Sequence, residues 1–373
     1  MKTKLSLIAL FFTLLLKYSF SQSYNSNFNQ FEIKTHYGFT LPHHSLMRYF
    51  INNNVAILEL NYSIKTDGSK PWQHAWRFPE MGGGYLIGGL GNINVLGFSQ
   101  SLFWFFGVPI IEKDNFIFKY RIGGGIAYLS EKFDYRANYY NVAIGSHFNA
   151  HLHFSIISEY KISNEFPLYL TSGLSYNHFS NGAIETPNLG LNQFSFNIGL
   201  KYLYSKFPYN LPKRTVPYVY NKIPELSVYL ASGIKENSTY ENKKFPFFSL
   251  VADYGYRVST IRTLGLGINI ISDFSLKSQI AEQNLVPNKI DILRIGIHGF
   301  QELYFTPDLS MLLQVGTYAF NKFKPSDKTF LVYSKLGLRY TFLERYFVNI
   351  VLKTHTTTAD YIEFGVGIKI ISD

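Results

Sequence analysis

The chain has 373 residues, no Cys, and 35 Lys and Arg against 25 Asp and Glu, which gives a formal net charge of +10. A chain without Cys can have neither a disulfide framework nor a thiolate metal site. Charged residues make up only 16% of the sequence and aromatic residues 18%, whereas soluble domains carry about 25% charge. This balance favours a protein with one face in lipid.

The N-terminus has the features of a secretory signal, which we assign to residues 1–21. Lys2 and Lys4 precede an apolar run over residues 5–16, and small residues suited to cleavage lie before Gln22. The run is shorter than the roughly 20 residues that a membrane-spanning helix needs. Export points the basic charge toward anionic lipid or lipopolysaccharide phosphates rather than nucleic acid, with the solubility of loops and lumen as an equal alternative.

From residue 31 onward, apolar side chains occupy every second position in segments of about ten residues. In the first segment Phe31, Ile33 and Tyr37 alternate with Glu32 and Lys34. This alternation is typical of transmembrane strands, and a closed β-barrel is the structure that an exported chain without apolar helices can insert into a membrane. We predict strands near residues 31–41, 54–65, 83–96, 98–108, 116–130, 146–160, 165–180, 191–205, 225–236, 246–257, 261–274, 289–303, 309–320, 328–341, 344–354 and 361–371.

The predicted fold is all-β, an antiparallel outer-membrane β-barrel of roughly 14–16 strands. The alternative is an eight-stranded barrel in residues 22–205 and a second β unit in residues 223–373, joined by a Pro-rich connection over residues 206–222. We favour one large barrel, because two closed barrels on one chain are unusual. One segment departs from the expected pattern, since residues 66–82 are long where a short periplasmic turn is expected.

The most informative stretch runs from Tyr176 to Gly182, where the seventh predicted strand ends. By parity, His178 and Ser180 share the apolar face of this strand, which should face lipid. On the next strand Asn192 falls on the same face. Polar side chains that face lipid are costly and are therefore candidates for function.

A Ser beside a His is the minimum arrangement for an activated nucleophile. The loop that follows offers hydrogen-bond donors for an oxyanion: the backbone N–H groups of Gly182 and Ala183 and the side-chain amides of Asn181 and Asn188. The plain alternative is that these are interfacial polar residues at the end of a strand.

The stretch His178-Phe179-Ser180-Asn181-Gly182, followed by Pro187-Asn188-Leu189-Gly190, resembles the signature of the outer-membrane lipid A 3-O-deacylases, the PagL type, also called acyloxyacyl hydrolases. The resemblance is local, although the eight-strand frame of residues 31–205 also matches the family's size. It implies a His and a Ser that work with a Glu on the next strand, at the outer leaflet. Such an enzyme cleaves an ester-linked acyl chain from lipid A, with no metal or cofactor.

One position departs from the family pattern, because the Glu falls on Asn192 by spacing. An Asn can orient a His but carries no charge to stabilise the imidazolium. Either Asn192 suffices, or Glu185 in the loop replaces the acid, or the site is weak or inactive. We favour the first outcome.

The predicted function is therefore an outer-membrane esterase acting on lipid A, with Ser180 as nucleophile, His178 as base and Asn192 as its orienting partner. The alternative is a non-enzymatic barrel, either a pore or a surface or adhesive protein, with a degenerate site. Other histidines carry weaker signals. His147, His151 and His153 share one lumen face without a carboxylate, and His43 and His44 lie in a predicted loop where we expect them to be solvated.

Overall fold

The computed structural model describes residues 28–163, 165–205, 213–215, 222–237, 243–322, 332–355 and 358–371. The predicted signal segment, residues 1–21, and most of the Pro-rich connection lie outside these ranges. Among the described residues, the helices are too short or too polar to span a bilayer.

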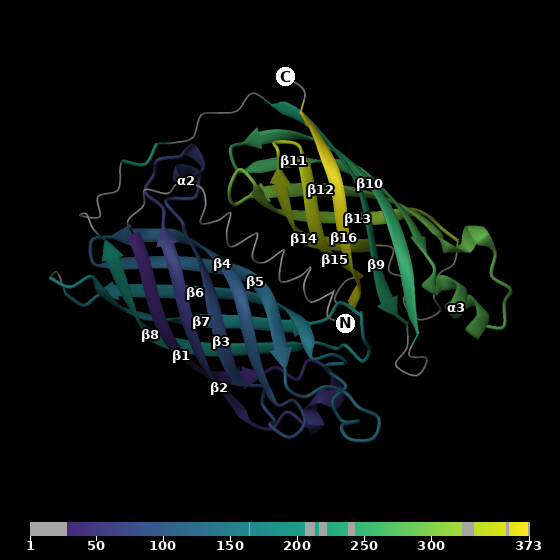
Figure 1. Cartoon of the computed structure of the whole chain (residues 1–373), viewed down its shortest axis with the longest axis horizontal. Coiled ribbons are helices and arrows are strands. Elements are labelled where there is room, and N and C mark those ends of the chain that lie inside the picture. Colours follow the sequence, from purple (N-terminus) through teal and green to yellow (C-terminus); the bar gives the residue numbers. More distant parts are fainter. Residues whose placement is uncertain are drawn as a thin grey trace.

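Sixteen strands in the described part of the chain form two closed antiparallel barrels, each with its strands in chain order (Figure 1). The first barrel consists of β1 (Phe28–Thr40), β2 (Asn54–Lys65), β3 (Glu80–Gly89), β4 (Phe98–Lys113), β5 (Phe116–Leu129), β6 (Phe148–Lys161), β7 (Leu168–Ser180) and β8 (Leu191–Ser205). The second consists of β9 (Ile223–Glu236), β10 (Lys244–Ser259), β11 (Arg262–Asp273), β12 (Leu293–Tyr304), β13 (Leu309–Asn321), β14 (Val332–Phe342), β15 (Tyr346–His355) and β16 (Thr358–Ile371).

The all-β class, the antiparallel barrel and all sixteen predicted strands are confirmed. The preference for one large barrel is corrected, because β8 pairs back with β1 and β16 pairs back with β9. Each set of eight strands thus satisfies its own edges by closure, which removes any need to pair with the other set. The structure has the alternative arrangement, an eight-stranded barrel followed by a second β unit.

Alternation of side chains explains why each strand lies as it does. On β1, Phe31 and Tyr37 are exposed on the outer surface, whereas Glu32, Lys34 and His36 are buried inside the barrel. An eight-stranded barrel has an interior just wide enough for side chains to fill. The polar positions of the alternation therefore build a packed core rather than a channel.

The core of the first barrel is a network of ion pairs between four carboxylates and four cations. Arg121 lies at its centre, with Nη2 2.7 Å from Glu80 Oε1 and 3.0 Å from Glu32 Oε2. Lys34 and Glu59 are 2.7 Å apart. The remaining members are Lys119, Glu159 and Lys201.

The second barrel has a core of the same kind. Arg339 Nη1 lies 2.9 Å from Glu302, and Lys335 lies 2.8 Å from Glu363. Buried charges are tolerated only when they are paired and hydrogen-bonded. The acidic and basic side chains that fill the two lumens meet this requirement by forming ion pairs with one another.

Four short helices lie outside the strands in the ranges described: η1 (Ser45–Tyr49), α2 (Pro71–Ala75), α3 (Ser275–Glu282) and η2 (Lys289–Ile292). Both strands that flank the long segment 66–79 are present, but the second, predicted over residues 83–96, ends at Gly89, and the expected short turn is wrong. The segment holds α2, and Trp72 of this helix and Trp76 directly after it join an apolar cluster with Phe305 and Leu309 of the second barrel.

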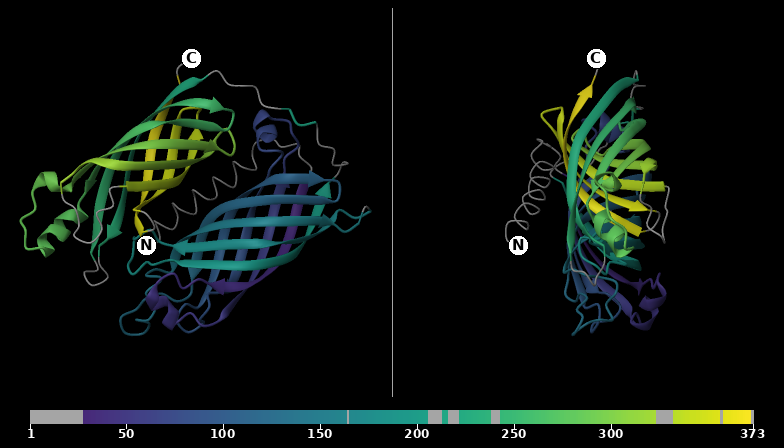
Figure 2. Two further views of the ribbon diagram at one scale, coloured as in Figure 1. Left: turned by 180° about the vertical axis from the view of Figure 1, so that it is seen from behind. Right: turned by 90° about the vertical axis from the view of Figure 1, so that its right-hand side faces the viewer.

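The two barrels lie side by side, with α2 at one end and α3 at the opposite end (Figures 1 and 2). Trp76 Nε1 donates a hydrogen bond to the Tyr304 carbonyl at 2.8 Å, next to the apolar cluster. The long segment between β2 and β3 is therefore part of the contact between barrels. A short turn would leave that contact unmade.

Candidate active site

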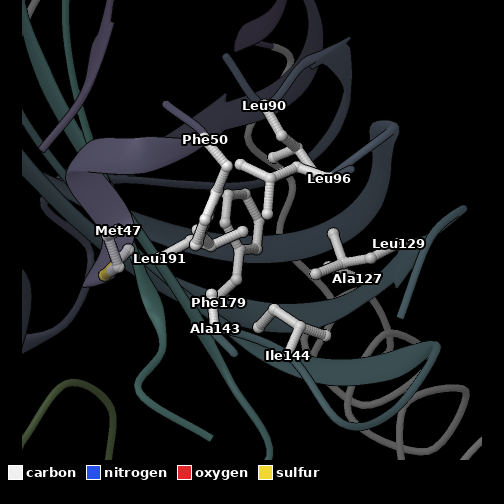
Figure 3. Packing of buried hydrophobic residues seen from close by; sticks show 10 residues of the cluster. All are labelled: Met47, Phe50, Leu90, Leu96, Ala127, Leu129, Ala143, Ile144, Phe179 and Leu191. Carbon is white, nitrogen blue, oxygen red and sulfur yellow. The ribbon is translucent and has the colours of Figure 1, made fainter. Parts of the chain in front are cut away.

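The candidate residues meet where β7 ends and β8 begins, at the end of the first barrel opposite α2. His178 and Asn192 are directly opposed in the β7–β8 register, followed by Phe179 and Leu191. Phe179 and Leu191 point inward and are fully buried in an apolar cluster that closes this end of the barrel (Figure 3). Because the inward neighbours are fixed, His178, Ser180 and Asn192 lie on the outward-facing side of these strand ends. There His178 and Asn192 are half-buried and Ser180 is buried.

These three side chains form one hydrogen-bonded chain. His178 Nε2 lies 3.0 Å from Ser180 Oγ, and His178 Nδ1 lies 2.6 Å from Asn192 Oδ1. The Tyr176 hydroxyl also donates to Asn192 Oδ1, at 2.8 Å. The structure thus brings together the three residues expected from strand parity, with His178 between a hydroxyl and an amide.

A fourth residue joins the chain from a distant part of the sequence. Asn192 Nδ2 lies 3.1 Å from His43 Nδ1, and His43 Nε2 lies 3.0 Å from the Leu189 carbonyl oxygen. Barrel closure places the segment after β1 here, since the Leu41 N–H donates to the Asn192 carbonyl at 2.7 Å. His43 is exposed, as predicted for a loop residue, and its contact with Asn192 was not predicted.

The loop between β7 and β8 is tied together by its own asparagines. The Asn181 side-chain amide donates to Ser146 Oγ at 2.8 Å and to the Glu185 carbonyl at 2.9 Å. Asn188 Oδ1 accepts the Asn181 N–H at 3.1 Å.

Gly182 and Ala183 follow Ser180 closely and both have left-handed backbone conformations, with φ of 60° and 63°. Within the described ranges, their N–H groups donate no hydrogen bond. This pair of consecutive donors lies two and three residues beyond Ser180.

Gly190, at the other end of the loop, packs against the ring of His178. It has a φ of +78°, and a Cβ placed there would lie 3.0 Å from His178 Cε1. Its N–H donates to the Ala143 carbonyl at 3.0 Å. A residue without a side chain at this position lets the loop close over the imidazole.

Residues of the second barrel also contact the loop between β7 and β8. Glu236, the last residue of β9, accepts the Thr186 N–H at 2.8 Å and the Thr186 hydroxyl at 3.1 Å, and its own N–H donates to the Ala183 carbonyl at 2.9 Å. Lys244 pairs with Glu185 at 3.0 Å. Glu185 therefore contacts the second barrel, and the structure gives it no contact with His178.

The lumen histidines lie behind the site, inside the barrel. His151 and His153 both contact Asn177 Oδ1, at 2.9 and 2.8 Å, and His151 also contacts Ser101. His147 bonds to the Leu129 carbonyl instead. In the described part of the chain, no group of three or more His, Asp or Glu side chains is arranged to hold a metal ion.

Two family models match the chain, one on each barrel. The model of lipid A 3-O-deacylase (PagL) matches residues 56–201, and the model of the C-terminal domain of acyloxyacyl hydrolase matches residues 224–372. The chain belongs to the PagL family of outer-membrane lipid A deacylases. This membership makes it an outer-membrane barrel protein of a hydrolase family that acts on lipid A.

Solved structures with detectable similarity to the chain include an enzyme and a translocator domain. The crystal structure of the outer membrane enzyme PagL is 17% identical, covering 45% of this chain and 97% of that chain, with a TM-score of 0.30. The translocator domain of the autotransporter NalP from Neisseria meningitidis is 9% identical, covering 99% and 96%, with a TM-score of 0.20. No curated protein matches the chain.

Proposed function

We propose that this PagL-family chain is an active esterase that removes an ester-linked acyl chain from lipid A, with Ser180 as the nucleophile, at the level of the outer leaflet. The observation that carries the proposal is the chain of contacts Ser180–His178–Asn192 on the outer surface of the barrel. A membrane lipid approaches the barrel from this outward side, and its acyl ester is a substrate for a nucleophile there, although Ser180 itself is only 7% exposed.

In the first half of the reaction, the Ser180 hydroxyl gives its proton to His178 Nε2 and its oxygen attacks the acyl carbonyl carbon. The ester C–O bond then breaks, and His178 passes the proton to the leaving oxygen, which departs as a hydroxyl. In the second half, His178 takes a proton from water while the water oxygen attacks the carbonyl carbon of the acyl-serine. The bond between that carbon and Ser180 Oγ then breaks, and His178 returns the proton to Ser180 Oγ. The products are the free fatty acid, the deacylated lipid and the regenerated Ser180.

Asn192 holds the imidazole in the orientation that these steps need, and the loop supplies the oxyanion donors. Gly182 and Ala183 offer consecutive N–H groups close to Ser180, and the Asn188 side-chain nitrogen is a third candidate. We assign Asn181 to holding the loop in shape, because its amide is already bonded to Ser146 and Glu185. Removal of one such donor typically costs about 10²–10³ in rate.

The alternative of a pore has no support in the lumens, which are filled by buried ion pairs around Arg121 and Arg339. A conducting channel of this width would need a path that these side chains occupy.

The decisive experiment is the mass spectrum of lipid A from a lipopolysaccharide-bearing host with and without the protein. We expect one acyl chain to be lost when the wild type is expressed and none when Ser180→Ala is expressed at an equal level in the outer membrane. Unchanged lipid A with the folded wild type would reject the esterase, and loss of the chain with Ser180→Ala would reject Ser180 as its nucleophile.

A further inference from the structure

An amide in place of the expected acid raises a problem of orientation. A carboxylate presents two equivalent oxygens to a histidine, whereas an amide presents either an oxygen or an NH₂ group. If the NH₂ group of Asn192 faced His178 Nδ1, the imidazole would carry its proton on Nε2 and could not accept the Ser180 proton. In a serine triad that wrong tautomer lowers kcat about 10⁴-fold.

Tyr176 alone does not solve the problem, because a phenol hydroxyl can either donate or accept. His43 does distinguish the two ends of the amide. Its Nε2 lies 3.0 Å from the Leu189 carbonyl oxygen, which can only accept, so Nε2 carries the proton. His43 Nδ1 is then an acceptor, and Asn192 Nδ2, at 3.1 Å, is the donor that it takes.

We propose that His43 is a positioning residue that fixes the Asn192 amide and thereby selects the reactive tautomer of His178. The inference rests on the proposed function. With this assignment, the hydrogen bonds between the Leu189 carbonyl and Ser180 all have the same direction of donation. His43 donates to Leu189, Asn192 donates to His43, His178 Nδ1 donates to Asn192 Oδ1, and Ser180 donates to His178 Nε2.

One contact of His43 opposes this assignment, because an unprotonated Nδ1 makes no hydrogen bond to the nearby Leu41 carbonyl oxygen. His43 Nδ1 is 3.3 Å from the Leu41 carbonyl oxygen, longer than its 3.1 Å separation from Asn192 Nδ2. If Nδ1 carried the proton, it would donate to the Leu41 carbonyl oxygen, and the Asn192 NH₂ group would lose its acceptor. Only the tautomer with Nε2 protonated serves both Leu189 and Asn192.

The test is a double-mutant cycle on the full chain in outer-membrane vesicles, with kcat and KM for lipid A deacylation as readouts. His43→Ala should lower kcat by about tenfold or more, with about 10⁴ as the limit, and leave KM unchanged because His43 acts through Asn192. In an Asn192→Asp background, the same substitution should change kcat little, because both oxygens of a carboxylate can accept from His178 and its orientation need not be fixed.

Two further variants keep the result interpretable. His43→Gln should restore most of the rate, because its side-chain oxygen can accept from Asn192 Nδ2. His44→Ala is the matched control, since His44 lies in the same loop but accepts from the Leu46 N–H rather than contacting Asn192. Its kcat should stay at the wild-type value.

Equal losses from His43→Ala in the wild-type and Asn192→Asp backgrounds would overturn the inference, as would a wild-type rate in the single variant. If Asn192→Asp is itself inactive, the comparison of His43→Ala with His43→Gln decides. An inactive wild type would instead reject the proposed function, so the two failures are distinguishable.

Discussion

At the scale of single residues, the site depends on an uncharged partner for its base. Asn192 Oδ1 accepts from both His178 Nδ1 and the Tyr176 hydroxyl, so the imidazole is oriented well. In the proposed reaction, the amide brings no negative charge to stabilise the imidazolium that forms when Ser180 passes its proton to His178. Orientation and charge, which one carboxylate supplies together, are therefore separated in this protein.

We expect Asn192→Asp to raise kcat, because the carboxylate adds charge stabilisation to an orientation that already exists. The gain has an upper bound of about 10⁴, the loss caused by the reverse change in a serine triad. Deacylation rates on purified lipopolysaccharide measure it, and Asn192→Asp combined with Ser180→Ala is the inactive control. A lower rate in the single variant would show that charge at this position costs more than it contributes.

That His178, Ser180 and Asn192 lie in contact could be predicted from sequence, because parity along a strand decides which side chains share a face. His178, Ser180 and Asn192 required only the alternation of two neighbouring strands joined by a short loop. His43 is far from Asn192 in the sequence and approaches it through the pairing of the first strand with the eighth. A prediction that β1 and β8 close the barrel would have placed the segment after Thr40 beside Asn192, and the one-barrel preference removed that signal.

At the scale of elements, the site is held between a buried inner layer and a tight outer loop. Phe179 and Leu191 anchor the two strand ends from inside, and Phe179 stacks on His151 with ring centroids 4.8 Å apart. Outside, the loop returns to β8 through Gly190, whose left-handed conformation brings the backbone against the His178 ring. The imidazole is thus restrained from two sides.

Gly190→Ala should lower kcat strongly while lowering the free energy of unfolding only modestly. A left-handed conformation costs a residue other than Gly about 1–2 kcal/mol, and the added methyl group would press on His178 Cε1. Stability is measured by thermal unfolding, monitored as a change in gel mobility. The value of kcat is measured from the rate of deacylation. Gly89→Ala is the control, since a Cβ at Gly89 meets no atom within 4 Å; equal rates for the two variants would contradict the expected role of Gly190.

At the scale of the whole molecule, the second barrel reaches the site of the first. Glu236 binds Thr186 and Ala183, and Lys244 binds Glu185, so three residues of the loop are attached to a different barrel. The sequence contained no sign of these contacts, because they depend on how two closed barrels pack. Hydrogen bonds to a charged group typically contribute about 1.5–3 kcal/mol, enough to hold a short loop in one conformation.

Glu236→Ala should therefore lower kcat by about tenfold, less than the loss of an oxyanion donor itself, while Glu236→Gln should retain most of the rate by still accepting from Thr186. Trp76→Phe is the matched control, because it removes a hydrogen bond between the barrels at their other end. Cross-linking between the barrels reports whether the barrels stay in contact, and rate measurements report whether the loop is still held in position. Together they distinguish the two effects. If Trp76→Phe and Glu236→Ala lower kcat equally, the loop has no special role.

The position of the second barrel also makes the approach to Ser180 one-sided. Gly182 lies against Ile362 and Leu352 of the second barrel, so that flank of the loop is covered. The other flank, along β8 and β1, presents the exposed aromatic rings of Phe194, Phe196 and Tyr37. If Ser180 is the nucleophile, as proposed, a lipid that approaches along β8 and β1 meets these rings before it reaches the loop. We expect that substituting them with charged residues would slow capture of the substrate rather than its cleavage.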